Sequence, residues 1–282
     1  MKFHQPAADV FIPDGQPVST ALARTTHLCL AAHQDDIEIM AHSAIAACYG
    51  RADAGFTGVV VTDGGGSPRA GRFANLTDEE MKRVRRDEQR RAAEIGRYAA
   101  QIQLAHPSSV VKDAKTSVVV DDIATLLATM SPRVVYLHNP ADKHDTHIAV
   151  FFRCLAALRA LPPERRPRQV LGCEVWRNLD WLLDTDKTVL DDSALPEVAA
   201  QLIGAFESQV AGGKRYDLAI AGRRLANATF FTSHATDKAN ALTWAMDLTP
   251  LVHDPRLDVE TFTLGYLDRL RADVAARLKK FA

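Results

Sequence analysis

Short apolar runs alternate with stretches of helical periodicity along the first half of the chain. The apolar runs predict strands over 27–32, 57–62, 101–105 and 133–138. Apolar positions at helical spacing predict helices over 37–49, 77–95 and 118–130. Strands that alternate with helices form parallel units, and continuous apolar runs suit strands buried on both faces. We therefore predict an α/β fold, a Rossmann-like three-layer sandwich with a mostly parallel sheet.

Local signals refine this prediction at a few places. Thr77 and Glu80 form a capping box at the start of the second helix. After residue 170 the pattern weakens, and it indicates only a strand over 172–176 and a helix over 195–206. We expect one domain over 1–282, with 1–25 and 236–282 as N-terminal and C-terminal extensions.

Composition narrows the class of protein. A formal net charge of -1 gives no general attraction for nucleic acid, and no apolar stretch is long enough to span a bilayer. The four cysteines form no CxxC pair and lie among apolar residues, which is typical of free thiols in a reducing compartment. The N-terminus lacks the apolar core of a signal peptide. We expect a cytoplasmic protein that binds neither nucleic acid nor membranes.

Two polar strings follow predicted strands and carry the candidate chemistry. The first is Ala32-His33-Gln34-Asp35-Asp36-Ile37-Glu38, and the second is Asn139-Pro140-Ala141-Asp142-Lys143-His144-Asp145-Thr146-His147. Each comes at the end of a strand, and ligands of open α/β sheets bind at the carboxyl ends of the strands. The two strings are therefore expected to face each other across a crevice.

The residue types in these strings suit a catalytic metal. Zinc enzymes use three protein ligands and keep a fourth position for water. His33 and Asp36 are three residues apart, and His147 can supply the third ligand. Asp35 is then a free carboxylate beside the metal, placed to take a proton from water, and His144 could aim at a substrate carbonyl oxygen. Zn²⁺ is the expected cofactor, and another divalent transition metal would also suit.

The two strings resemble the motifs of the PIG-L family, also called LmbE-like. The first family motif is Ala-His-Pro-Asp-Asp-Glu, with variants ending in Asp-Asp-Ile-Glu, and the chain matches it except at Gln34. The second is His-Pro-Asp-His, of which His144 and His147 are kept. The likeness covers about residues 27–235, and the first 150 residues match better.

The resemblance implies a function and a set of roles. Family members are zinc-dependent hydrolases that remove acetyl groups from N-acetylated amino sugars and their conjugates. By resemblance, His33, Asp36 and His147 bind zinc, Asp35 is the general base and His144 stabilises the oxyanion. A family arginine early in the third helix contacts substrate; Arg85 is the best match and Arg86 an alternative. Ser208-Gln209 resembles a late Ser-Gln pair of many members.

Two departures from the family pattern have expected consequences. Gln34 replaces a proline that fixes the loop, so we expect a less constrained loop. Thr146 replaces an aspartate behind the metal site, and loss of such a carboxylate weakens metal affinity by roughly 10–100-fold.

Several further segments have two interpretations each. Asp63 and Gly64 begin a glycine-rich string that we place beside the substrate; a phosphate-binding loop or a plain turn are the alternatives. The segment 176–181 suits either a sugar pocket or core packing. The segment 212–217 suits either a pocket loop or a surface turn. The other histidines have weaker signals. His42 is expected to pack in its helix, and lining of the site is the less favoured interpretation for His106, His138 and His234.

The sequence thus predicts hydrolysis of an N-acetyl group on a small-molecule amino-sugar substrate. One alternative is an amidase of a larger thiol- or antibiotic-sugar conjugate with the same chemistry. Another is a catalytically weak sugar-binding protein that keeps the pocket, which Gln34 and Thr146 would favour. A homo-oligomer is possible, although no interface can be identified from the sequence.

Overall fold

One mixed sheet runs through the computed structural model, which describes all 282 residues. Its strands, in spatial order, are β1 (Asp9–Phe11), β4 (Ala100–His106), β3 (Gly55–Thr62), β2 (Thr25–Ala31), β5 (Val134–His138), β6 (Gln169–Cys173), β8 (Leu242–Asp247) and β7 (Thr188–Asp191). The strands from β4 to β6 are parallel, whereas β1 and β8 run antiparallel to their neighbours. The predicted mostly parallel sheet is confirmed.

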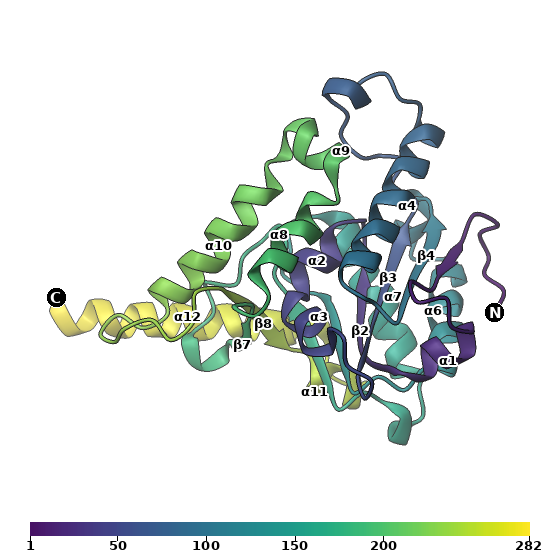
Figure 1. Cartoon of the computed structure of the whole chain (residues 1–282). Coiled ribbons are helices and arrows are strands. Elements are labelled where there is room, and N and C mark those ends of the chain that lie inside the picture. Colours follow the sequence, from purple (N-terminus) through teal and green to yellow (C-terminus); the bar gives the residue numbers. More distant parts are fainter.

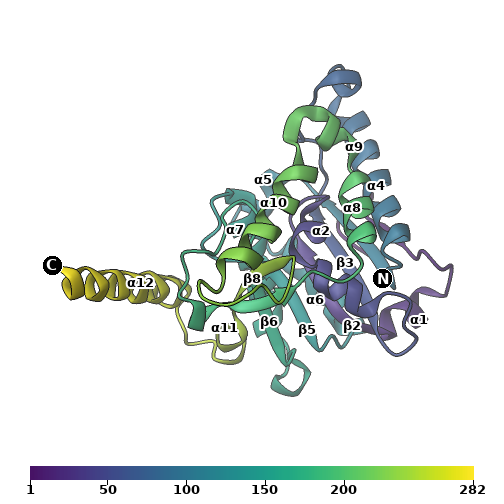
Figure 2. The ribbon, with the colours of Figure 1, turned by 60° about the vertical axis from the view of Figure 1, so that its left-hand side comes forward.

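Helices cover both faces of this sheet and complete the three layers (Figures 1 and 2). One face carries α1 (Val18–Ala23), α5 (Ser108–Lys112), α6 (Val118–Thr129), α7 (Asp145–Arg159) and α11 (Thr249–His253). The other carries α2 (Asp36–Met40), α3 (His42–Cys48), α4 (Asp78–Ile95), α8 (Pro196–Gly204), the short α9 (Glu207–Gln209) and α10 (Tyr216–Phe230). The last helix, α12 (Val259–Phe281), projects from the body in both views.

Strand β2 shows why the apolar runs do not alternate with polar residues. Leu28 and Leu30 pack into the hydrophobic core on one face, whereas Cys29 and Ala31 pack into the core on the other. All four side chains are buried, so neither face of the strand needs polar residues. The four cysteines of the chain are buried and unpaired, as expected.

The strongest local patterns predict their elements well. Each of the four expected strands lies within two residues of an observed one, and the helices expected over 77–95 and 118–130 correspond to α4 and α6. The Thr77 hydroxyl accepts from the Glu80 backbone N–H, and the Glu80 carboxylate accepts from Thr77 N–H at 2.8 Å. The capping box is therefore confirmed.

The helix expected over 37–49 is wrong in one respect, because the structure divides it at Ala41. The Ala41 backbone leaves the helical region, with φ at -129°, so α2 ends and α3 begins there. The guanidinium of Arg224, on α10, donates to the carbonyl oxygens of Glu38 and Ile39 at 2.9 and 3.1 Å. This distant side chain satisfies carbonyls that the short helix leaves without internal partners.

The second half of the chain differs more from the expectation. The strand predicted over 172–176 begins three residues earlier, at Gln169, and the helix predicted over 195–206 is the shorter α8. The stretch 1–25 supplies β1 and α1, and the stretch 236–282 supplies β8, which lies between β6 and β7. Both stretches thus contribute strands to the sheet. None of the helices combines the length and the apolar character needed to cross a membrane.

The order of the strands places a crevice at the middle of the sheet. From β2 the chain moves outward through β3 to β4, and it later returns to β5 on the other side of β2. Ligands of such sheets bind where the direction of winding changes, outside the carboxyl ends of the strands. Both candidate strings lie there, since one follows β2 and the other follows β5.

Candidate metal centre

The turn after β2 fixes the first group of candidate residues. Asp35 precedes α2 with φ at +88°, in the left-handed region that costs energy for a residue with a Cβ. The Asp36 backbone N–H bonds to the carbonyl of His33, and the His33 N–H donates to the Asp36 carboxylate at 2.8 Å. This tight turn directs the side chains of Asp35 and Asp36 to different neighbours.

One atom from each of His33, Asp36 and His147 lies within 3.3 Å of the other two. His33 Nδ1 lies 3.2 Å from Asp36 Oδ2 and 3.1 Å from His147 Nε2, and the last two atoms are 3.3 Å apart. A tetrahedral zinc ion with bonds of about 2.0–2.1 Å has ligand–ligand separations of about 3.3 Å. The spacing and the donor set therefore fit a zinc ion bound by these three side chains.

The charges at this point also suit a cation. Although burial opposes it, His147, His138 and His33 hold the pKa of Asp36 well below its usual range. Burial would lower the pKa of His147, but the Asp36 and Asp142 carboxylates outweigh it and raise the pKa to about 9. The Asp36 and Asp142 carboxylates thus favour positive charge at this point, either a proton on His147 or a bound cation that replaces that proton.

Asp142 supports the cluster and has no counterpart among the residues predicted from the sequence. Its Oδ2 lies 3.1 Å from Nδ1 of His147, so it fixes the ring tautomer that leaves Nε2 free to bind metal. It also accepts from the backbone N–H groups of Lys143, Trp176 and Arg177. The only signal in the sequence is a carboxylate within the second polar string.

A carboxylate therefore does stand behind the ligand set, contrary to the expectation drawn from Thr146. The expectation of a lost carboxylate was based on position 146, directly before His147. The chain supplies it from Asp142, five residues before the ligand, by the path of the loop after β5.

His138, given only a minority chance from the sequence, lies directly behind the ligands. It ends β5, its ring stacks on that of His147 with centroids 3.8 Å apart, and its Nε2 lies 3.5 Å from Asp36 Oδ2. The same Nε2 accepts a hydrogen bond from Ala32 N–H at 2.9 Å. Because that lone pair is in use, His138 fits a supporting residue better than a fourth ligand. Burial lowers its pKa to about 4, so the ring is neutral.

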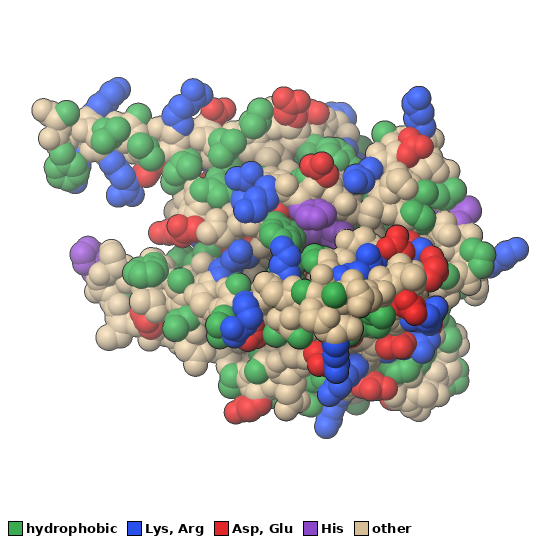
Figure 3. All heavy atoms as spheres, turned by 90° about the horizontal axis from the view of Figure 1, so that it is seen from above, with side chains coloured by type: hydrophobic (Ala, Val, Ile, Leu, Met, Phe, Trp, Pro, Cys, Tyr) green, Lys and Arg blue, Asp and Glu red, His purple; other side chains and the backbone are tan.

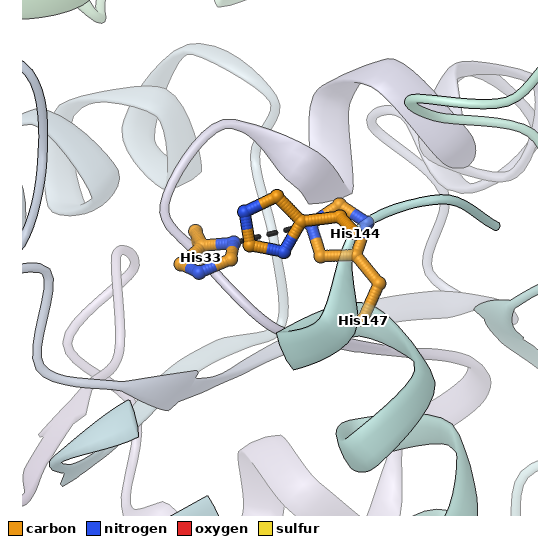
Figure 4. A group of neighbouring side chains, drawn as sticks. All are labelled: His33, His144 and His147. Carbon is orange, nitrogen blue, oxygen red and sulfur yellow. Dashed lines mark hydrogen bonds between the residues drawn. The ribbon is translucent and has the colours of Figure 1, made fainter. Parts of the chain in front are cut away.

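His144 completes a group of three imidazole rings (Figure 4). Its ring centroid lies 5.0 Å from that of His33 and 4.5 Å from that of His147, and the three rings could also share an ion. Burial and the neighbouring His147 and His33 lower the pKa of His144. Its Nδ1 is buried without a hydrogen-bond partner. A neutral ring of this kind has an N–H to donate to a substrate oxygen.

Asp35 lies beside the ligands and contacts a different partner. Its Oδ2 accepts from the Arg85 guanidinium at 2.8 Å, and both side chains are buried. Burial raises the pKa of Asp35 to about 6, and Arg85 offsets only part of that rise. Arg85 also contacts Glu88 and the carbonyl of Gln34. Arg86, the alternative to Arg85, lies half-buried outside the site.

Gln34 is held firmly, so the expectation of a less constrained loop is wrong. Its side chain is buried, and its Nε2 donates to Gln103 Oε1 at 3.1 Å and to the Thr62 carbonyl at 3.4 Å. These bonds tie the motif loop to β3 and β4. Hydrogen bonds thus constrain the loop where the family uses the ring of a proline.

A polar cleft of about 420 Å³ opens above the metal centre. Figure 3 looks onto this face and shows histidine side chains in its middle with lysine and arginine side chains around them. The lining residues are His33, Asp35, Asp36, Thr62, Gly64, Gly66, Ser67, Pro68, Arg85, Ser108, Lys112, His144, Thr146, Trp176, Gln209, Lys214 and Tyr216. The volume is typical of sites for small molecules.

Other residues expected near the substrate lie at different places. Gly64 lines the cleft, but the Asp63 carboxylate points elsewhere and pairs with Lys82 at 3.1 Å. Trp176 lines the cleft, whereas Trp181 packs against the core. The segment 212–217 contributes two lining residues, and Gln209 of the Ser-Gln pair contributes another.

The remaining histidines lie outside the cleft. His42 is buried in α3 and bonds to the Ala194 carbonyl at 2.8 Å, as its helical packing implied. His106 pairs with Asp122 at 2.9 Å, and His234 is exposed.

Comparison with known proteins agrees with this geometry. Residues 28–158 match the PIG-L family, described as GlcNAc-PI de-N-acetylase. This segment contains both polar strings and all the candidate ligands, so the similarity to the PIG-L family covers the candidate site. No curated protein matches the chain.

Solved structures with the same fold have different described activities. The N,N'-diacetylchitobiose deacetylase from Pyrococcus horikoshii has a TM-score of 0.64 at 16% identity, covering 82% of this chain and 86% of that one. A deacetylase of teicoplanin biosynthesis has a TM-score of 0.54 at 14% identity over 78% and 96%. The 4-carboxy-2-hydroxymuconate hydratase from Pseudomonas putida has a TM-score of 0.62 at 19% identity over 83% and 98%. At these identities the likeness defines the fold alone.

Proposed function

We propose that the chain is a zinc-dependent N-deacetylase that releases acetate and a free amine from an N-acetylated amino sugar or its conjugate. One observation carries the proposal. Three ligand atoms are mutually separated by 3.1–3.3 Å, while the adjacent Asp35 carboxylate pairs with Arg85. A hydrolase of this kind needs a bound metal and, beside it, a base that is not itself a metal ligand.

The roles of the side chains follow from their contacts. Zinc held by His33, Asp36 and His147 would lower the pKa of water to about 7 and polarise the amide carbonyl. Asp35 takes the proton of the attacking water, because its carboxylate is adjacent to the ligands and its pKa is about 6. It then gives this proton to the departing amine. His144 donates a hydrogen bond to the oxygen that becomes negative.

Arg85 positions the base. It donates both to the Asp35 carboxylate and to the backbone carbonyl of the preceding residue, Gln34. The guanidinium keeps the carboxylate turned from the metal ligands, and it limits how far burial raises the pKa of Asp35.

A panel assay tests the proposed reaction. Enzyme stripped with a chelator and then reloaded with zinc is incubated with N-acetylglucosamine, diacetylchitobiose and a glycopeptide that bears an N-acylated amino sugar. Released acetate and free amine are measured together. We expect both products in equal amounts from at least one substrate after reloading, and none from the stripped enzyme.

The hydratase with the same fold makes this measurement necessary. Addition of water to a carbon–carbon double bond releases no acetate, so a hydratase would give no product in the panel assay. Hydration of a carboxylated muconate without any acetate release would overturn the proposal. The anchored Gln34 and the carboxylate partner of His147 favour the hydrolase over the weak sugar-binding alternative.

A further inference from the structure

The rim of the cleft carries positive charge that the proposed reaction does not use. The only carboxylates that line the cleft are Asp35 and Asp36, on its floor. A divalent ion would neutralise Asp36, and Asp35 is paired with Arg85. Two further lining residues, Lys112 and Lys214, carry positive charge, and no other carboxylate lines the cleft.

The two lysines come from separate walls. Lys112 ends α5, whose Val111 packs into the core on one face of the sheet. Lys214 follows α9, in a segment whose Val210 packs against the core on the other face. Neither ammonium group has an ion pair or a hydrogen bond within the chain, unlike Lys82 and Lys187.

Lys214 is also held in place by an aromatic side chain. Its Nζ lies 5.0 Å from the centre of the Trp176 ring, and both residues line the cleft. A cation over an aromatic face is stabilised while its remaining donors stay free. The chain as a whole has a net charge of only -1, so this positive rim is a local feature.

We propose that the substrate carries an anionic group, a carboxylate or a phosphate, on the part that projects from the metal centre, and that Lys112 and Lys214 bind it. The inference rests on the proposed function and adds a substrate class to it. The acetamido group binds at the floor of the cleft, and the anion is held between the two walls. A neutral amino sugar of the same size lacks this second point of binding.

Matched glycosides test the inference. The methyl glycoside of N-acetylglucosamine is neutral, its glycolate glycoside carries a carboxylate and N-acetylglucosamine 1-phosphate carries a phosphate. We expect kcat/KM for at least one anionic compound to exceed that of the methyl glycoside by about tenfold or more. The compound preferred identifies which anion the rim accepts.

Substitutions test whether Lys112 and Lys214 cause the preference for anionic glycosides. The double variant Lys112→Gln/Lys214→Gln is expected to lose the preference while kcat/KM for the methyl glycoside stays within about twofold. Lys214→Arg, which keeps the charge over Trp176, should retain it. Lys115→Gln is the matched control, because Lys115 is an exposed lysine three residues from Lys112 and does not line the cleft.

Two outcomes would overturn the inference. One is equal kcat/KM for all three glycosides, and the other is an equal loss for all three in the double variant. If no glycoside releases acetate, the panel assay decides the proposed function, and calorimetric binding to the zinc-loaded enzyme decides the inference alone. Equal affinities for neutral and anionic compounds would then refute it.

Discussion

Two adjacent carboxylates, Asp35 and Asp36, have different surroundings, and the proposed chemistry depends on that difference. Asp36 faces three imidazole rings, which keep its pKa low and its oxygen available as a ligand. Asp35 faces a guanidinium in a buried setting, which leaves its pKa near 6. A left-handed backbone at Asp35 separates the two side chains.

Asp142 is the residue whose substitution tests the support of the metal ligands. We expect Asp142→Asn to weaken zinc affinity by roughly 10–100-fold, because the His147 ring loses the carboxylate that fixes its tautomer. Competition with a chromogenic chelator measures this affinity. Asp145→Asn is the control, since Asp145 is exposed in the first turn of α7. Equal affinities in the two variants would contradict the assignment.

Arg85 and Arg86 form a second matched pair. We expect Arg85→Lys to lower kcat by about 10-fold or more, because lysine keeps the charge but cannot contact both Asp35 and the Gln34 carbonyl. Arg86→Lys should change kcat by less than about twofold, as Arg86 lies outside the cleft. A larger effect at Arg86 would show that the wrong arginine has been placed in the site.

At the scale of elements, the site depends on how loops leave the strands. The residues in both polar strings could be found from the sequence because each string follows a continuous apolar run. Asp142 and His138 could not be assigned in this way, because their roles depend on which atoms the loop after β5 brings against His147. The division between α2 and α3 could not be predicted either, since it involves Arg224, which lies 185 residues beyond Ile39 in the chain.

Gly64, after β3, shows how closely these loops pack. Its φ is +74°, and an added Cβ would lie 2.6 Å from Gln34 Oε1 and 3.0 Å from Arg85 Cβ. We expect Gly64→Ala to lower the free energy of unfolding by about 1–3 kcal/mol in urea denaturation. Gly66→Ala should cost less than about 0.5 kcal/mol, because no atom lies within 4 Å of its added Cβ. Similar losses in both variants would refute this packing argument.

At the scale of the whole molecule, the parallel centre of the sheet was predictable and its edges were not. The central strands have continuous apolar runs, whereas β1 is only three residues long and half-buried. The stretch 236–282 gave no clear pattern, yet it places Trp244 of β8 in the core. The edge strand β1 has too few residues for a periodicity to be recognised, and β8, inside the sheet, has only six. The possible homo-oligomer stays a prediction.

Truncation distinguishes the contribution of β8 from that of α12 within the stretch 236–282. Removal of 268–282 deletes the projecting end of α12, which contributes no buried side chain, so zinc content and kcat should stay within about twofold. Removal of 236–282 also deletes β8 and exposes its neighbours, so we expect loss of the cooperative unfolding transition. A folded, active 1–235 fragment would contradict the place given to β8 in the sheet.

Zinc content and acetate release, measured on the same preparations of the wild type and the variants Asp35→Asn and Asp36→Asn, test the central claim most directly. The proposed roles predict that Asp35→Asn keeps about one zinc per chain and loses about 10²–10⁴-fold in kcat. Asp36→Asn should lose both zinc and activity, because it removes a ligand. Loss of zinc in Asp35→Asn, or full activity in either variant, would contradict the division of roles between the two carboxylates.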